Sequence, residues 1–257
     1  MASKVIIVTG ASRGIGLAVA KFLLKDSHKL VLAARSKDQL EALKSEYPGK
    51  VEYVAGDLGD LTTIPKIAEV AVEKFGRIDG VVINHGVLEP VTRLENASIE
   101  DWKKAYDVNV FSGLALAQAA LAELRKSKGC VLWVSSGAAT GAYAAWGAYG
   151  SSKAAVNHIS AHLAVEEPDI TSIAISPGRV DTAMQKVIRD SGKGHMAEKD
   201  HSSFVSDFDK GGLLRPEQPG HVIARFVVNP QQDLSGKFVK WQAGELAAYQ
   251  DAQGGVH

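Results

Sequence analysis

The sequence predicts a single α/β domain, a doubly wound sheet of seven parallel strands with helices on both faces. Short runs rich in valine, isoleucine and leucine alternate with longer amphipathic segments along the 257 residues. Several short runs are apolar throughout, which is typical of strands covered on both faces. Because parallel neighbours need crossover connections, this alternation indicates repeated right-handed β–α–β units. The length also suits one large domain better than two small ones.

Strands and helices are expected in strict succession from the N-terminus. The predicted strands are Val5–Thr9, Lys29–Ala34, Val51–Ala55, Gly80–Asn84, Gly129–Ser135, Ser172–Ser176 and Lys237–Trp241. The predicted helices between them are Ile15–Lys25, Lys37–Glu46, Leu61–Phe75, Glu100–Arg125, Tyr149–Val165 and Glu217–Val228.

One region interrupts this succession. The segment Asp181–Leu214 is polar, contains glycine and is only weakly periodic. A long irregular stretch inside a compact domain is usually a functional lid or a mobile insertion. We expect 181–214 to be an irregular lid over the substrate.

Composition excludes several classes of function. The formal net charge is zero, so nothing favours nucleic acid or an anionic membrane as a partner. The single cysteine, Cys130, excludes an intrachain disulfide and is expected to be a small buried apolar residue. No signal peptide and no apolar stretch of about 20 residues is present, so we expect a soluble cytoplasmic protein. Nothing in the sequence points to a metal site.

A glycine-rich loop follows the first predicted strand. Gly10, Gly14 and Gly16 lie between that strand and the first predicted helix. Gly10 permits a tight turn, Gly14 lets the backbone approach a pyrophosphate, and Gly16 lets the helix pack closely on the strand. Phosphates would then bind at the helix N-terminus, where free N–H groups favour negative charge. We interpret the loop as the dinucleotide site of a Rossmann fold; an ordinary strand–helix turn is the alternative.

The end of the second strand indicates which dinucleotide binds. Enzymes that use NAD place an acidic residue there for the ribose 2′-hydroxyl, but this chain has Arg35 after two alanines. Arg35 can pair with a 2′-phosphate through two hydrogen bonds, and Arg13 and Ser12 in the loop can assist it. Solvated surface arginines are the alternative. We predict NADP (NADPH) as the cofactor.

Tyr149 and Lys153 are four residues apart on one predicted helix, so they share one face of it. An ammonium beside a phenol favours the phenolate and lowers the pKa of tyrosine from about 10. Tyr149 is therefore predicted to exchange a proton with an alcohol–carbonyl pair. Ser136 precedes it by thirteen residues.

Together these features resemble the short-chain dehydrogenase/reductase family over nearly the whole chain. The matching segments, in order, are Thr9–Gly16, Asp57-Leu58, Asn84-His85-Gly86, Asn109, Ser136, Tyr149 with Lys153, and Pro177-Gly178. Within the family, the stretches around Trp146, Pro168 and 177–185 look like the sepiapterin reductase branch. They look closer still to the benzil reductases that form (S)-benzoin.

The resemblance implies a role for each catalytic residue. Ser136 would hydrogen-bond the substrate oxygen, and Tyr149 would pass it a proton as hydride arrives from the nicotinamide. Lys153 would bind the nicotinamide ribose and lower the pKa of Tyr149. Asn109 would hold a water that links Lys153 to solvent.

The resemblance also implies a cofactor site. Asp57 and Leu58 would contact the adenine, Asn84 the adenosine side, and Thr182 with the 177–180 backbone the carboxamide end. The full expected set is Gly10, Ser12, Arg13, Gly14, Ile15, Gly16, Arg35, Asp57, Leu58, Asn84, Gly86, Tyr149, Lys153, Pro177, Gly178, Val180 and Thr182.

Two positions depart from the family pattern. His85 replaces the usual alanine of an Asn-Ala-Gly motif; we interpret it as a packing change, with contact to the adenosine ribose as the alternative. The sepiapterin reductases carry an acid near the C-terminus that anchors the pterin. The corresponding stretch 236–241 contains no acid, which counts against a pterin substrate.

The expected substrate pocket is rich in aromatic and methionine side chains, which suit a bulky or aryl ketone. Its predicted residues are Tyr143, Trp146, Met184, Met196 and Phe204. No clamp for a substrate carboxylate is evident except Arg179.

The sequence thus predicts an NADPH-dependent reductase of ketones or 1,2-diketones. The alternatives are an NADP-dependent alcohol or hydroxysteroid dehydrogenase, a pterin reductase, and an NADP-sensing protein that has lost turnover. The resemblance also implies a homodimer or homotetramer.

Overall fold

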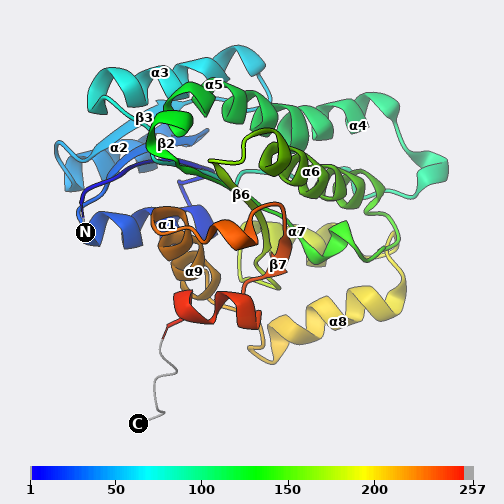
Figure 1. The fold of residues 1–257 in the computed structure, drawn as a ribbon. Coiled ribbons are helices and arrows are strands. Elements are labelled where there is room, and N and C mark those ends of the chain that lie inside the picture. The colour runs from blue at the N-terminus through cyan, green and yellow to red at the C-terminus, as the bar shows by residue number, and fades with distance from the viewer. Residues whose placement is uncertain (1, 252–257) are drawn as a thin grey trace, which may run out of the picture.

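The computed structural model describes residues 2–251 and places seven parallel strands in one sheet, in the order β3-β2-β1-β4-β5-β6-β7 (Figure 1). The strands are β1 (Val5–Thr9), β2 (Lys29–Ala34), β3 (Val51–Ala55), β4 (Gly80–Ile83), β5 (Cys130–Val134), β6 (Thr171–Ser176) and β7 (Phe238–Lys240). All seven predicted strands are confirmed, with ends that differ by a residue or two. Since β1 pairs with both β2 and β4, the winding reverses there. Ligands of such sheets bind at this switch point, beyond the carboxyl ends of the strands.

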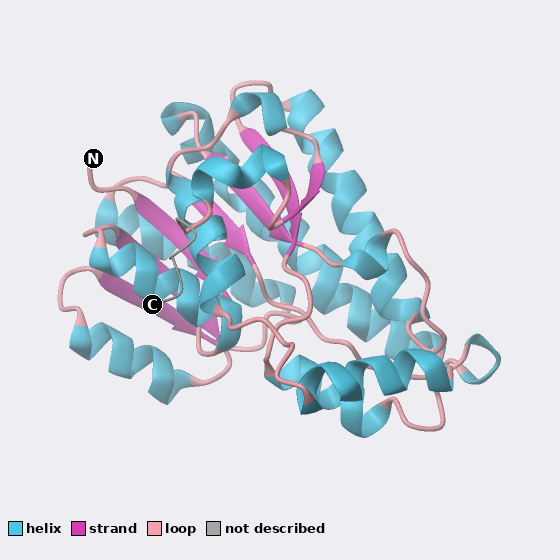
Figure 2. Cartoon of the chain, turned by 90° about the horizontal axis from the view of Figure 1, so that it is seen from below, coloured by secondary structure: helices cyan, strands magenta, loops and turns pink. Residues whose placement is uncertain are grey.

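Helices cover both faces of the sheet (Figures 1 and 2). One face packs against α1 (Gly14–Lys25), α2 (Lys37–Glu46) and α9 (Glu217–Val228). The other face packs against α3 (Ile64–Phe75), α5 (Ser112–Ser127) and α6 (Gly147–Glu166). The predicted doubly wound α/β fold is therefore confirmed. No helix within residues 2–251 is both long and apolar enough to span a membrane.

The long helix predicted at 100–125 is interrupted. α4 (Ile99–Tyr106) passes into a π-helical turn, Asp107–Phe111, before α5 begins. The hydroxyl of Ser112 donates a hydrogen bond of 2.7 Å to the carbonyl of Val108, inside this turn. Such π turns are frequent at functional sites, and this one carries Asn109.

The prediction that segment 181–214 is irregular is wrong. The segment contains two helices, α7 (Ala183–Ser191) and α8 (Glu198–Asp209), which pack on each other. Each helix buries only a few side chains, such as Ile188 and Phe204, while its other faces are polar. α8 buries Phe204 alone and α7 is only nine residues long, so neither gives a long periodic pattern in the sequence.

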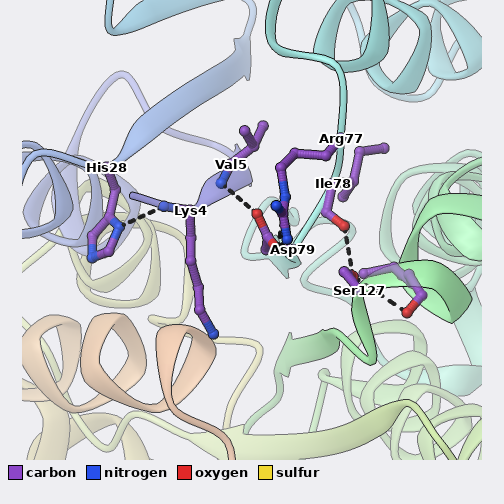
Figure 3. Close-up of polar contacts among 8 residues, drawn as sticks. Lys4, Val5, His28, Arg77, Ile78, Asp79 and Ser127 are labelled. Carbon is purple, nitrogen blue, oxygen red and sulfur yellow. Dashed lines mark hydrogen bonds and ion pairs between the residues drawn. The ribbon is translucent and has the colours of Figure 1, made fainter. Parts of the chain in front are cut away.

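At the amino ends of the strands, a buried carboxylate joins two neighbouring strands (Figure 3). Asp79 accepts a hydrogen bond of 2.8 Å from the backbone N–H of Val5 and pairs with Arg77 at 2.6 Å. His28 accepts from the N–H of Lys4 at 3.0 Å. These contacts satisfy backbone donors at the end of the sheet opposite the cofactor loop.

Candidate active site

A cavity of about 570 Å³ lies at the carboxyl ends of the strands, where the topology places a ligand. Most of the predicted cofactor residues line it, together with Met184 from the predicted substrate pocket. The cofactor residues at its wall are Gly10, Ser12, Arg13, Gly14, Ile15, Arg35, Asp57, Leu58, Asn84, Gly86, Tyr149, Lys153, Pro177 and Thr182.

The sequence prediction and the cavity wall differ at a few positions. Gly16, Gly178, Val180 and Ser136 are not part of the wall. Additional residues do line it, and most are chain neighbours of predicted ones. They are Ala34, Ser36, His85, Val87, Val108, Val134, Ser135, Asp181, Ala183 and Pro216. Proximity along the chain could have identified most of these, but Pro216 has no local signal.

The glycine loop requires its glycines for close backbone packing. A Cβ on Gly16 would lie 2.4 Å from the carbonyl oxygen of Gly10, a distance that real Cβ atoms do not reach. Gly10 has a φ of +63°, in the left-handed region that favours glycine. Asn84 holds this turn by donating to the carbonyls of Thr9 at 3.0 Å and Gly10 at 3.3 Å. The carboxamide nitrogen of Asn84 is thus engaged by the loop itself.

The N-terminus of α1 faces the cavity without a side-chain cap. Arg13 occupies the N-cap position and makes no capping hydrogen bond. The N–H groups of the first helical turn therefore remain available to an anion. Thr182 closes this side of the cavity, since a Cβ on Gly14 would lie 3.2 Å from its methyl group.

Two exposed arginines, Arg13 and Arg35, line the cavity. Within residues 2–251 neither forms an ion pair, although twelve other ion pairs are present. Both guanidinium groups are therefore free to bind a phosphate. Asp57 also lines the cavity and accepts from the N–H of Gly59 at 3.0 Å.

Burial controls the pKa of Tyr149. Burial raises this pKa above its usual value, and a hydrogen bond with Ser136 acts in the opposite direction. The expected lowering by Lys153 is therefore wrong for this structure; the Lys153 Nζ lies 5.9 Å from the centre of the Tyr149 ring. At neutral pH the phenol keeps its proton, so Tyr149 is present as a proton donor.

Lys153 is buried within the first turns of α6. Burial lowers its pKa to about 8, because the charged form is costly to desolvate. Its Nζ donates a hydrogen bond of 2.8 Å to the carbonyl of Val134 at the end of β5. The ammonium is thereby fixed at the cavity wall.

Asn109 is buried in the π turn and holds the loop after β4. Its Oδ1 accepts from the N–H of Val87 at 2.8 Å, and its Nδ2 donates to the Val87 carbonyl at 2.9 Å. Nδ2 also donates to Ser152 at 3.1 Å, one residue before Lys153. A Cβ on Gly86 would lie 3.1 Å from Asn109 Oδ1 and 3.5 Å from Lys153 Nζ. The structure therefore gathers Asn109 and Lys153 around Gly86.

The predicted aromatic pocket residues pack on one another rather than around open space. Trp146, Met196 and Phe204 are each at least 94% buried and belong to one apolar cluster with Tyr149 and Ile188. The Trp146 ring meets the Tyr149 ring edge-on at 5.8 Å.

The remaining pocket residues flank this cluster. Tyr143 stacks obliquely on Trp146 at 4.7 Å. Met184 is partly buried against the cluster and also reaches the cavity. Of the five predicted pocket residues, only Met184 is at the cavity wall.

Arg179 is engaged within the chain, although it was the one candidate clamp for a substrate carboxylate. Its guanidinium pairs with Asp207, donates to Ser203 at 2.8 Å, and lies 3.9 Å from the centre of the Phe204 ring. All three partners are on α8. Arg179 therefore attaches α8 to the loop that follows β6.

The cavity fits a dinucleotide. It combines close backbone approach at the glycine loop, an uncapped helix N-terminus and two arginines that form no ion pair within residues 2–251. Tyr149, Lys153 and Pro177 line the same cavity. Phosphates would bind at the loop and the arginines, and the nicotinamide would lie beside Tyr149 and Lys153.

Comparison with known proteins agrees with this geometry. The family model for short chain dehydrogenases matches residues 4–193. The chain is 36% identical over 260 residues to a benzil reductase ((S)-benzoin forming) of Saccharomyces cerevisiae, covering 96% of this chain and 99% of the relative.

Solved structures give the same result. The KRED1-Pglu enzyme is 43% identical, with a TM-score of 0.90 over 92% of this chain and 100% of that one. An alcohol dehydrogenase of the archaeon Thermococcus sibiricus, in complex with 5-hydroxy-NADP, is 27% identical, with a TM-score of 0.77 over 93% and 96% of the chains. The resemblance deduced from the sequence is confirmed: the chain belongs to the short-chain dehydrogenase family of oxidoreductases.

Proposed function

We propose that the protein is an NADPH-dependent carbonyl reductase that transfers hydride to a bulky ketone or 1,2-diketone. The observation that carries the proposal is the placement of a protonated Tyr149, hydrogen-bonded with Ser136, and of Lys153 at the wall of the cavity that the glycine loop also lines. A carbonyl that accepts hydride needs such a donor at its oxygen.

The choice of NADPH rests on charge. Arg13 and Arg35 are unpaired within residues 2–251 and line the cavity, and neither Arg35 nor its neighbours 33–36 provide a carboxylate. A 2′-phosphate would be neutralised there, whereas a free 2′-hydroxyl would lack its usual acceptor. The relative solved with 5-hydroxy-NADP supports this choice.

The catalytic residues have separate tasks. When bound, the cofactor supplies the hydride. Tyr149 donates its phenolic proton to the substrate oxygen, on which negative charge develops as the carbonyl carbon is reduced. Ser136 hydrogen-bonds the same oxygen and keeps it in line with the phenol. Lys153, held on the Val134 carbonyl, orients the ribose and stabilises the phenolate left after proton transfer.

Asn109 would hold a water between Lys153 and solvent. The two N–H groups of its amide are engaged by Val87 and Ser152, while Oδ1 accepts a single hydrogen bond from Val87. One lone pair of Oδ1 thus remains for a water. This water would return a proton to Tyr149 by way of Lys153 and the ribose.

The substrate class rests on the apolar cluster beside Tyr149. Trp146, one helical turn before Tyr149, is buried, and its indole N–H has no hydrogen-bond acceptor within residues 2–251. A shift of α7 and α8, our proposed lid at 181–214, would open this cluster to an aryl group. The second oxygen of a diketone would then accept from Trp146. The similarity to a benzil reductase supports the same class.

The test is the consumption of NADPH by the purified protein with benzil, smaller 1,2-diketones, simple aldehydes, sugars and hydroxysteroids. We expect the fastest turnover with the diketones and aryl ketones. The substrate proposal fails if diketones and ketones are inert while a sugar or a hydroxysteroid is turned over. Repeating the assay with NADH tests the cofactor separately.

We also infer a homodimer or homotetramer. Phe111 and Val165 remain 46% and 81% exposed at opposite parts of the α5–α6 layer. A symmetric contact through these helices would cover them. Light scattering of the eluting protein tests the inference, and a monomer at micromolar concentration contradicts it.

A further inference from the structure

His85 makes a polar bridge in the core of the site. It lies in the Asn84-His85-Gly86 motif, is 9% exposed, and has a hydrogen-bond partner at each ring nitrogen. Nδ1 lies 2.7 Å from the hydroxyl oxygen of Thr9, and Nε2 lies 2.6 Å from that of Ser112. The ring thus spans from the end of β1 to the first residue of α5. The expectation of a simple packing change does not describe this residue.

The neighbouring hydrogen bonds determine which ring nitrogen carries the proton. The Ser112 hydroxyl donates its proton to the Val108 carbonyl at 2.7 Å, so it can only accept from His85. Nε2 is therefore protonated. Nδ1 accepts from the Thr9 hydroxyl at 2.7 Å, a shorter contact than the 3.2 Å between that hydroxyl and the carbonyl oxygen of Val82, the other acceptor in its reach. The opposite tautomer would make the Thr9 oxygen accept a third N–H, because it already faces the N–H groups of Asn84 at 3.0 Å and His85 at 3.4 Å.

The ring is also held neutral. Burial lowers the pKa of His85 to about 3, and the nearby positive charge of Lys153 acts in the same direction. A hydrogen bond with the backbone of Val108 and, to a lesser extent, the charge of Asp57 act in the opposite direction. The bridge therefore keeps one protonation state throughout the working pH range of most enzymes.

The chain of donors ends in the π turn. Thr9 donates to His85, His85 to Ser112, and Ser112 to the carbonyl of Val108, the residue immediately before Asn109. In the same turn, the side chain of Asn109 forms hydrogen bonds with both the N–H and the carbonyl of Val87. The segment that follows β4 thus holds the π turn at two points, through the His85 ring and through Val87.

We propose that His85, as the Nε2–H tautomer, is a positioning residue that holds the π turn and thereby the proton-relay amide of Asn109. It acts through Ser112 and does not touch the reacting atoms. This role rests on the proposed carbonyl reductase function, because Asn109 matters only if Lys153 and Tyr149 must be reprotonated. Alanine at this position would leave the Ser112 oxygen without its donor.

Substitution of His85 by glutamine or asparagine tests its two hydrogen bonds, to Ser112 and to Thr9, one at a time. In His85→Gln the amide nitrogen can replace Nε2 and donate to Ser112, whereas in His85→Asn the amide oxygen can replace Nδ1 and accept from Thr9. We expect His85→Ala and His85→Asn to lower kcat about 10- to 100-fold, as displaced catalytic groups do. His85→Gln should recover most of this loss. NADPH affinity, measured by fluorescence titration, should change much less than kcat in all three variants, because both ring nitrogens of His85 face Thr9 and Ser112.

Ser112→Ala should reproduce the loss, and its combination with His85→Ala should lower kcat no further than either change alone. His221→Ala, at a partly buried histidine of α9 on the other face of the sheet, is the control and should keep the wild-type kcat. Equal losses for Gln, Asn and Ala would mean that the ring only fills space, and would overturn the proposal. Full activity of His85→Ala would do the same.

Nitrogen-15 NMR of the imidazole tests the tautomer independently of any substrate. We expect a single state, protonated at Nε2 and bare at Nδ1, that does not titrate between about pH 5 and pH 8. An Nδ1–H tautomer or a titrating ring would overturn the proposal. If the wild-type protein reduces no carbonyl, the proposed function fails. The NMR measurement still tests the tautomer of His85 in that case, because it needs no substrate.

Discussion

The Nζ of Lys153 donates its hydrogen bond to the carbonyl oxygen of Val134, at 2.8 Å, where strand β5 ends. This contact joins the helix that carries Tyr149 to the strand that leads into Ser136. It also holds a buried ammonium at the cavity wall, where desolvation makes the charge costly. The charge state of Lys153 is therefore expected to depend on pH near neutrality.

The activity should fall as the pH rises through about 8. The lowered pKa of Lys153, about 8, means that its ammonium is fully present below this pH and is lost above it. The free-enzyme pKa appears in the profile of kcat/KM, which should decline on the alkaline side. In Lys153→Arg the guanidinium stays charged, so the decline should move to higher pH even if the rate is lower. If the alkaline decline of kcat/KM stays at the same pH in Lys153→Arg, a group other than Lys153 causes it.

Replacement of Gly86 by alanine should impair catalysis more than stability. The added Cβ would lie 3.1 Å from Asn109 Oδ1, so the Asn109 side chain must shift by a few tenths of an ångström, while Lys153 Nζ at 3.5 Å would be in ordinary van der Waals contact. We expect kcat to fall about tenfold, because misplaced catalytic groups are costly, with a small change in the midpoint of thermal unfolding. Gly244→Ala is the matched control, since its Cβ would meet no atom within 4 Å.

Tyr149→Phe should abolish turnover and keep cofactor binding. Removing one general acid lowers rates by about 10²–10⁴, while the glycine loop and the arginines that bind the phosphates are untouched. Single-turnover kinetics and NADPH titration measure the two effects. Tyr106→Phe provides a control on the adjoining helix, because it removes a phenol that donates only to Ser151 at 2.9 Å. Wild-type activity in Tyr149→Phe would exclude this phenol as the proton donor.

Arg35→Asp should shift the preference from NADPH toward NADH. A charge-assisted hydrogen bond is worth about 1.5–3 kcal/mol, so the KM for NADPH should rise roughly 10- to 100-fold. The new carboxylate can accept from a ribose 2′-hydroxyl, so the KM for NADH should fall. Arg93→Asp makes the same change of charge at an exposed arginine outside the cavity. If the preference for NADPH over NADH changes equally in both variants, Arg35 does not belong to the cofactor site.

Loosening α8 should affect the carbonyl substrate more than NADPH. Arg179→Ala removes the pairing with Asp207 and the stacking on Phe204 that attach α8 to the loop after β6. We expect faster amide hydrogen exchange in 198–209 and a higher KM for the ketone. Lys186→Ala breaks an exposed ion pair with Asp190 within α7 and should leave both quantities unchanged. No change of exchange in Arg179→Ala would show that α8 is held by other contacts.

Local pattern determined the fold and most of the cofactor site. Apolar runs such as β1 and β5 are buried throughout, so their composition alone marks them as internal strands. Two requirements for glycine in the first loop are also local: Gly10 has a φ of +63°, and a Cβ on Gly16 would lie 2.4 Å from the carbonyl oxygen of Gly10. The spacing of Tyr149 and Lys153 needs nothing more than helical periodicity.

Tertiary packing decided the rest. Burial reversed the expected pKa shift of Tyr149, since desolvation depends on the whole surrounding fold and outweighs one neighbouring charge. The π turn at Asn109 and the bridge through His85 arise from contacts between segments that are distant in the chain. Helices α7 and α8 were not predicted, because α7 is short and α8 buries Phe204 alone; they are ordered by packing on each other, which the periodicity of such segments does not reveal. The sequence by itself named the reacting groups, and the three-dimensional structure set their charge states and their supports.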